Sequence, residues 1–399
     1  MAAPLPPALA GAAMFFFFLP GIVAQAFLLD LPGPLDAELS LLQFNAEVMS
    51  SKDVAPSPAS TMQASMVTRA NHHPCPFGIT DEGVAATVQT MAEANCSLDE
   101  ERIQVLTRPR PRAWFGQAVI RVAYSSVNPV NWKVLLNNHF SVAYPQPMGF
   151  DFAGTVESVG LGCDLSPGDE VWGVGQGTYA EYAAVDCPAT GRKPAGLSMK
   201  EAGVLPLVAL TGLEGLQWAG APWASGPTVV VLGGSGGTGS AGVQLAKALG
   251  ASKVITTASP SNFEFVRDLG ADEVIDYHTA NWWEVIPARS VDLVYDCVCL
   301  AGTGDNAYRV LKDGGSFVTI QNTPLANATT RASRPSVSQH SYILSKRDRG
   351  QLDILRSFAE ARQLTAAIDS VFGLKSIPEA FGASMTSHTV GKIAIDSQA

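Results

Sequence analysis

The chain carries little charge and has no dense run of lysine or arginine. Charged residues make up 16% of the 399 positions, and 36 acidic side chains outnumber 26 basic ones, which gives a formal net charge of −10. Nucleic acids are bound by clusters of basic side chains gathered on one face of a protein. Their absence argues against a nucleic-acid partner.

Cysteine is scarce, and its spacing does not suit a metal site. The six cysteines are scattered, and they are Cys75, Cys96, Cys163, Cys187, Cys297 and Cys299. Only the last two are close, with one residue between them. This pattern matches neither the paired C-x₂-C spacing of a zinc lobe nor a dense disulfide framework. We therefore expect mostly reduced thiols.

The N-terminal segment lacks basic side chains, because no lysine or arginine precedes Lys52. Residues 8–29 are uncharged and apolar, and residues 24–26 (Ala-Gln-Ala) resemble a cleavage site that would leave Phe27 as the first residue. The missing early arginine disfavours a mitochondrial presequence. We expect an organellar protein, in a plastid, with a cleaved signal and no stable membrane span in the mature form. A cytoplasmic protein and a single membrane anchor are the alternatives.

A strand, a glycine-rich turn and a helix follow one another after residue 228. The apolar run at 229–232 ends in small residues, an apolar-periodic helix ends near Gly250, and residues 253–257 predict a second parallel strand. Such a turn lets backbone N–H groups approach a pyrophosphate, and the helix N-terminus favours its charge. The pattern predicts a dinucleotide site. Its binding residues would be Gly234, Gly236, Gly237, Thr238 and Gly239.

An acidic residue is missing at the end of the second predicted strand. Sites for NAD usually place Asp or Glu there to bind the ribose hydroxyls, whereas this chain has no carboxylate before Glu264. Small hydroxyl and amide groups can bind a 2′-phosphate that a carboxylate would repel. We therefore predict NADPH rather than NADH, with Ser259 and Asn262 beside the phosphate. A helix cap or a turn is the alternative role for these residues and for Ser261.

Two kinds of secondary structure divide the chain. Short strands with frequent glycine turns between residues 117 and 185 predict a small β-rich domain, and a helix is expected over residues 201–216. Alternating strands and helices then run to about residue 322, which predicts a doubly wound parallel sheet. Residues 71–97, which include His72 and His73, could not be placed. The fold class is therefore α/β with a second, β-rich unit.

Five short motifs follow one another along the chain, and they are residues 126–133 (SVNPVNWK), 149–154 (GFDFAG), 168–171 (GDEV), 269–277 (LGADEVIDY) and 391–392 (GK). In this order they resemble the medium-chain dehydrogenase/reductase superfamily, nearest to its zinc-free quinone oxidoreductase and alkenal/enone reductase branch. The resemblance implies a GroES-like catalytic domain around a Rossmann domain. The expected divisions are a leader and linker at 1–61, the catalytic domain at 62–206, the NADP-binding domain at 207–339 and the rest of the catalytic domain at 340–399.

The metal ligands of zinc-dependent members are absent. Those members place a cysteine near the position of Asn128 and a Gly-His-Glu sequence where this chain has residues 149–151, Gly-Phe-Asp. A zinc site needs three or four converging N, S or O ligands. The resemblance therefore implies no metal.

The resemblance also assigns residues around the cofactor. Asn128 matches the position where the family holds the nicotinamide and substrate, although a turn residue before a proline is its plainer explanation. Thr211 matches a hydroxyl that contacts the cofactor, with a back-bonded helix threonine as the alternative. Tyr277 matches a residue near the 2′-phosphate.

Hydride transfer to a conjugated carbonyl leaves negative charge on an oxygen, which needs hydrogen-bond donors when no zinc is present. Lys133, five residues after Asn128, is the candidate cation, and an exposed surface lysine is the alternative reading. Tyr144 or Tyr179 could donate a proton, as could the nicotinamide ribose hydroxyl.

These observations predict an NADPH-dependent reductase of α,β-unsaturated carbonyls or quinones. A trans-acting enoyl reductase on carrier-bound chains and a non-catalytic NADPH-binding sensor are the alternatives. The partner expected is a small-molecule enone or quinone, and a homodimer is left open.

Overall fold

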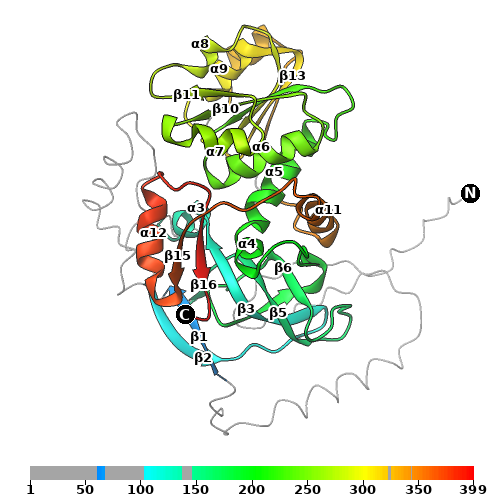
Figure 1. Ribbon diagram of the computed structural model, residues 1–399, viewed down its shortest axis with the longest axis vertical. Coiled ribbons are helices and arrows are strands. Elements are labelled where there is room, and N and C mark those ends of the chain that lie inside the picture. Colours follow the sequence, from blue (N-terminus) through cyan, green and yellow to red (C-terminus); the bar gives the residue numbers. More distant parts are fainter. Residues whose placement is uncertain (1–60, 68–102, 137–145, 322–324, 343) are drawn as a thin grey trace, which may run out of the picture. The chain divides into compact units, whose positions relative to one another are not determined.

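The computed structural model describes residues 61–67, 103–136, 146–321, 325–342 and 344–399 (Figure 1). From Pro58 onward the chain belongs to one compact unit. The apolar segment at 8–29 lies outside the described residues, as do Tyr144, His72 and His73. Among the helices of the described part, none is long and apolar enough to cross a membrane.

Six parallel strands form the first large sheet (Figure 1). Their order is β11-β10-β9-β12-β13-β14. The bounds are β9 Thr228–Leu232, β10 Lys253–Ala258, β11 Glu273–Asp276, β12 Val291–Asp296, β13 Leu311–Thr319 and β14 Ser338–Ser341. The order steps outward from β9 in both directions, so the predicted doubly wound parallel sheet is confirmed.

Helices cover both faces of this sheet because its central strands are apolar on both sides. On β9, Val229 and Val231 join one buried cluster, whereas Val230 and Leu232 join another. The first cluster includes residues of α5 (Pro206–Trp218) and α6 (Gly237–Ala248). The second includes residues of α8 (Trp282–Val285) and α9 (Thr303–Val310). Near-continuous apolar runs are typical of strands buried on both faces.

A second, mostly antiparallel sheet forms the β-rich part. Its order is β15-β16-β3-β5-β6-β8, with β7 also paired to β3. The bounds are β3 Gln117–Val127, β5 Asp151–Val159, β6 Glu170–Val174, β7 Tyr182–Asp186, β8 Thr190–Arg192, β15 Ile368–Gly373 and β16 Lys392–Asp396. The C-terminal strand β16 therefore returns to pair with β3 from the first half of the chain. Figure 1 shows β16 beside β3.

The remaining elements complete the described chain. A small sheet has the order β2-β1-β4, with β1 Thr61–Val67, β2 Ile103–Pro109 and β4 Gln146–Pro147. The helices not yet named are α3 Pro129–Leu136, α4 Met199–Val204, α7 Phe263–Asp268, α10 Ala328–Ser333, α11 Arg349–Glu360 and α12 Ile377–Met385.

The single helix expected over residues 201–216 is two helices. A capping box between Ser198 and Glu201 starts α4, and Pro206 starts α5. Proline has no N–H to bond the carbonyl four residues earlier, but it suits the first position of a new helix.

The expectation of mostly reduced thiols is wrong for one pair. Cys163 and Cys187 form a disulfide with Cα atoms 5.6 Å apart, while Cys297 and Cys299 are free. The two half-cystines are 24 residues apart in sequence. Sheet pairing brings them together, because Cys163 follows β5, Cys187 follows β7, and both strands pair with β3. Sequence spacing alone carries no signal for such a pair.

Candidate functional site

The glycine turn after β9 is packed too tightly for side chains. A Cβ atom on Gly234 would lie 2.1 Å from Thr256 Oγ1, and one on Gly239 would lie 2.0 Å from the Gly233 carbonyl oxygen. Thr257 Oγ1 also accepts the Gly233 N–H at 2.9 Å. Gly234 therefore allows the turn to lie against β10, and Gly239 allows the start of α6 to lie against the turn itself.

The N-terminus of α6 leaves its first-turn donors without a side-chain cap. Gly236 is the N-cap residue and has no side chain to accept a hydrogen bond. The first N–H groups of a helix have no intrahelical acceptor, and they favour an anion. Gly237, Thr238 and Gly239 supply these donors. The arrangement fits the pyrophosphate of a dinucleotide.

A cluster of small polar side chains lies at the carboxyl end of β10. Ser259 Oγ is 3.2 Å from Ser261 Oγ, and Asn262 Nδ2 donates to Ser259 Oγ at 3.0 Å. Asn262 occupies the N-cap of α7 but makes no capping hydrogen bond with its side chain. The capping alternative is therefore not what the structure shows for Asn262.

Tyr277 lies next to this cluster by strand register. Ala258 of β10 pairs with Asp276 of β11, so Ser259 and Tyr277 follow paired residues. The Tyr277 ring is 55% exposed and stacks on His278 with centroids 4.2 Å apart. These positions can hold a 2′-phosphate and the adenine end of a dinucleotide.

A buried hydrogen-bond network joins β3, β5 and β16. Asn128 Nδ2 donates to Asp151 Oδ2 at 2.6 Å, and Lys392 Nζ donates to Asn128 Oδ1 at 2.5 Å. Ser126 Oγ and the Leu207 N–H also donate to the Asp151 carboxylate. Asn128 is therefore not merely a turn residue before a proline, since both ends of its amide are bonded.

The charges in this network are fully buried. Lys392 Nζ lies 3.9 Å from Asp151 Oδ2, and the two side chains are 5% and 0% exposed. Burial lowers the pKa of Lys392 to about 8, although the attraction of Asp151 opposes the change. Burial raises the pKa of Asp151, and Lys392 with the hydrogen bonds opposes it. Each ion stabilises the charge of the other in this buried site.

Lys392 and the preceding residue, Gly391, both lie against the glycine turn. The Gly391 N–H donates to the Ser235 carbonyl at 2.8 Å, and a Cβ on Gly237 would lie 2.7 Å from Lys392 Cδ. The network around Asn128 is thus connected directly to the start of α6. Asp151 and Lys392 were not predicted as site residues, although both lie in the motifs quoted above. A charged residue within an apolar strand was the sequence feature that could have indicated them.

Lys133 lies in the last turn of α3, with its Nζ 5.7 Å from the centroid of the Trp132 ring. Burial lowers the pKa of Lys133, and an interaction with Cys299 opposes this change. Lys133 has no ion-pair partner in the described part of the chain. It is half-buried, rather than an exposed surface lysine.

Two other predicted residues, Tyr179 and Thr211, have hydroxyl groups that are hydrogen-bonded within the protein. Tyr179 is fully buried, and its hydroxyl donates toward the Ser126 carbonyl and Asn131 Oδ1, at 3.0 and 3.1 Å. Burial raises its pKa well above the usual value. This geometry does not suit a proton donor to a substrate. Thr211 Oγ1 donates to the Leu207 carbonyl at 2.7 Å, which is the back-bonded arrangement.

The part of the chain that the structure describes contains no group of three or more His, Cys, Asp and Glu side chains able to hold a metal ion. Phe150, at the position of the family's zinc-binding histidine, offers no ligand atom and packs against an apolar cluster.

Comparison with known proteins identifies the family. Residues 115–194 match the alcohol dehydrogenase GroES-like domain, and residues 269–395 match the family described as zinc-binding dehydrogenase. The 2-methylene-furan-3-one reductase of Solanum lycopersicum is 36% identical over 70% of this chain and 71% of its own. The chloroplastic NADPH-dependent alkenal/one oxidoreductase of Arabidopsis thaliana is 34% identical over 70% of this chain and 72% of its own.

A solved structure shows the same fold. The quinone oxidoreductase from Coxiella burnetii has a TM-score of 0.68 at 24% identity, covering 84% of this chain and 99% of its own. The chain belongs to the medium-chain dehydrogenase/reductase superfamily, in the branch of quinone oxidoreductases and alkenal/enone reductases.

Proposed function

We propose that the protein reduces the carbon–carbon double bond of α,β-unsaturated carbonyl compounds, or quinones, with NADPH. The observation that carries the proposal is the connection between the helix of Lys133 and the glycine turn. Lys133 lies on α3, which follows Asn128, and Asn128 is bonded to Lys392, next to the start of α6. Ligands of open parallel sheets bind outside the carboxyl ends of the strands, and α6 follows the carboxyl end of β9.

Each set of residues has a separate task in this proposal. The N–H groups at the start of α6 hold the pyrophosphate, and Ser259, Asn262 and Tyr277 hold the 2′-phosphate. Bound NADPH supplies the hydride that adds to the conjugated carbon. Lys133 then stabilises the negative charge that develops on the substrate oxygen. Such a preorganised donor acts only when charge develops, which lowers the barrier instead of tightening ground-state binding.

In this proposal Asn128 and Lys392 position the neighbouring elements and take no part in the reaction. The Asn128 amide is fixed between Asp151 and Lys392, and it begins the turn into α3, which carries Lys133. Tyr179 is not the proton donor in this proposal, because its hydroxyl already makes hydrogen bonds to Ser126 and Asn131. Solvent or the nicotinamide ribose hydroxyl then protonates the enolate carbon or oxygen.

The test is an oxidation assay of NADPH with the purified chain. Acrolein, long-chain enals, cyclic enones and quinones are compared at equal concentration, and the products are identified by mass spectrometry. Saturated carbonyl products support reduction of the double bond, and hydroquinones support quinone reduction. Tight NADPH binding with no turnover of any acceptor would instead support a sensor built on this fold.

We also propose an organellar, plastid location. The relative from Arabidopsis thaliana is named as chloroplastic, and residues 8–29 have the apolar character of a translocated signal. A compartment with NADPH and enals suits the activity proposed above.

A further inference from the structure

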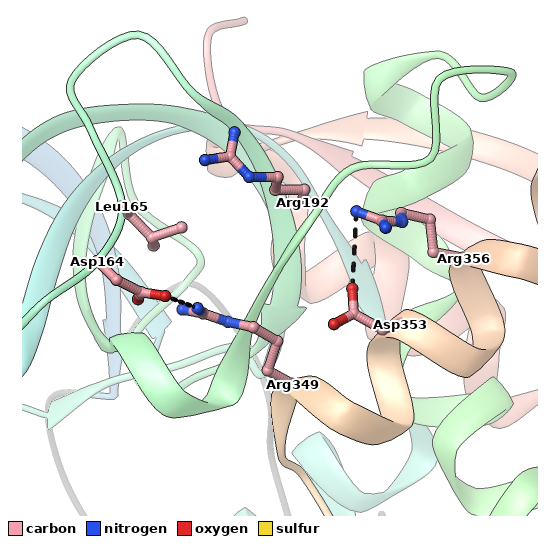
Figure 2. Close-up of a pocket in the computed structure, with 6 residues that line it drawn as sticks. All are labelled: Asp164, Leu165, Arg192, Arg349, Asp353 and Arg356. Carbon is pink, nitrogen blue, oxygen red and sulfur yellow. Dashed lines mark hydrogen bonds and ion pairs between the residues drawn. The ribbon is translucent and has the colours of Figure 1, made fainter.

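The disulfide lies next to a hollow lined by arginines, and none of the lining residues belongs to the candidate site. The hollow has a volume of about 260 Å³ and is lined by Asp164, Leu165, Arg192, Arg349, Asp353 and Arg356 (Figure 2). Asp164 and Leu165 follow the half-cystine Cys163 directly. Arg349 donates to the carbonyl of the other half-cystine, Cys187, at 2.7 Å. Neither half-cystine lines the hollow, but Cys163 adjoins two of its lining residues in sequence and Cys187 is bonded to a third, Arg349.

We propose that this hollow binds a small thiol carrying carboxylates, of the glutathione class, which exchanges with the Cys163–Cys187 disulfide. Glutathione has two carboxylates and one ammonium group, and the hollow offers three guanidinium groups and two carboxylates. Arginine binds carboxylates through paired N–H donors.

Two of the arginines have donors to spare. Arg356 lies 3.6 Å from Asp353 and 3.8 Å from Glu360, which are loose ion pairs. Arg192 is paired through one nitrogen with Asp169 at 2.9 Å, and its side chain is 55% exposed. Since a guanidinium group has five N–H donors, both side chains can turn donors toward a bound carboxylate.

The two half-cystines differ in exposure. Cys187 is 1% exposed, whereas Cys163 is half-buried in the loop between β5 and β6. The incoming thiolate therefore attacks Cys163. A bond forms between its sulfur and Cys163 Sγ, the Cys163–Cys187 bond breaks, and Cys187 Sγ leaves with the electron pair and takes a proton from solvent. The guanidinium group of Arg349 near Cys187 favours the departing thiolate.

The fold keeps a second tether across the same gap. Arg349 bonds the Asp164 carboxylate, the Cys187 carbonyl and the Thr190 carbonyl, so it links both segments that the disulfide joins. Opening the disulfide therefore leaves the loop attached. The exchange is reversible, because the Cys187 thiolate can attack the mixed disulfide and expel the thiol.

The experiment compares thiols of different charge on the oxidised, purified full chain. Glutathione, neutral 2-mercaptoethanol and cationic cysteamine react for timed intervals, acid stops the exchange, and peptide mass spectrometry locates the adduct. Each rate is corrected for the thiolate fraction of its thiol. In the wild-type chain we expect an adduct on Cys163 and a preference for glutathione over 2-mercaptoethanol.

The variant Arg192→Gln/Arg356→Gln should lower the glutathione rate about fivefold to tenfold and leave the 2-mercaptoethanol rate unchanged, because local charge raises the encounter rate of an anion. Arg289→Gln/Arg331→Gln removes the same charge elsewhere and should change neither rate. The preference should shrink in 0.5 M salt. Free thiols at both cysteines in the native chain, an adduct on Cys187, or an equal loss of both rates in the pocket variant would overturn the proposal.

Discussion

Lys392 Nζ donates to Asn128 Oδ1 at 2.5 Å, across 264 residues of sequence. Asn128 starts the turn into α3, and Lys392 follows Gly391, whose N–H is bonded to the glycine turn at Ser235. One hydrogen bond thus joins the helix that carries Lys133 to the strand that touches the start of α6. The candidate catalytic lysine and the candidate phosphate site are placed relative to each other through this buried amide.

The first prediction concerns the stability of this network. The pKa of Lys392 is about 8 in the folded chain and near 10.5 when unfolded. Between these values the unfolded chain binds more protons, so this lysine makes stability rise with pH. The free energy of unfolding, measured in urea from pH 7.5 to 10, should rise more in wild type than in Lys392→Met, by on the order of 1–3 kcal/mol.

The comparison with a variant is needed because other groups titrate in the same range. Burial raises the pKa of Cys297 well above its usual value and that of Cys299 to about 12, which makes stability fall as pH rises. Both cysteines are present in wild type and in Lys392→Met, so their contribution cancels when the two slopes are compared. Asp151→Asn alone should cost about 3–5 kcal/mol by leaving a buried ammonium unpaired, and Asp151→Asn/Lys392→Met should recover much of that loss. Equal slopes in wild type and Lys392→Met would contradict the lowered pKa of Lys392.

The second prediction concerns cofactor choice. The Ser259, Ser261 and Asn262 cluster has no carboxylate, so NADPH should have a lower Michaelis constant than NADH with the same enone. Ser259→Asp should weaken NADPH by on the order of 1–3 kcal/mol through repulsion and a lost hydrogen bond, with little effect on NADH. Ser338→Asp, at an exposed position of β14, adds the same charge as a control. Equal constants for the two cofactors in wild type would refute the assignment.

The third prediction concerns metal. The positions of the family's zinc ligands hold Asn128, whose amide is fully bonded, and Phe150. Activity should therefore survive prolonged treatment with a strong chelator, and elemental analysis should find no stoichiometric zinc. One tightly bound zinc per chain, lost together with activity, would contradict this expectation.

The fold could be predicted from sequence where the segments that pack together are close to one another in the chain. The run at 229–232, the glycine turn and the strand at 253–257 form one continuous unit, and they became β9, α6 and β10. The pairing of Lys392 with Asn128 was out of reach, because no local pattern records a contact across 264 residues. The disulfide was missed for the same reason. Tyr179 was chosen for its hydroxyl, but only the packed structure shows that this group is buried and bonded.

The fourth prediction concerns the leader, which lies outside the described residues. Residues 8–29 are apolar and uncharged, and residues 24–26 resemble a cleavage site. N-terminal sequencing of the native protein should therefore find a mature terminus at or beyond Phe27, in a plastid fraction. An intact Met1 or Ala2 terminus in a cytosolic fraction would show that the segment is not a cleaved signal.

The last prediction concerns Lys133. If its ammonium group stabilises charge on the substrate oxygen, Lys133→Ala should lower the turnover number by roughly a hundredfold or more, while the affinity for NADPH changes little. Lys133→Arg keeps the charge and should retain part of the rate. Lys375→Ala, at an exposed position, is the matched control and should behave as wild type. Single-turnover rates of NADPH oxidation separate the chemical step from product release. An unchanged single-turnover rate in Lys133→Ala would remove this lysine from the reaction, because a donor that acts on developing charge cannot be lost without raising the barrier.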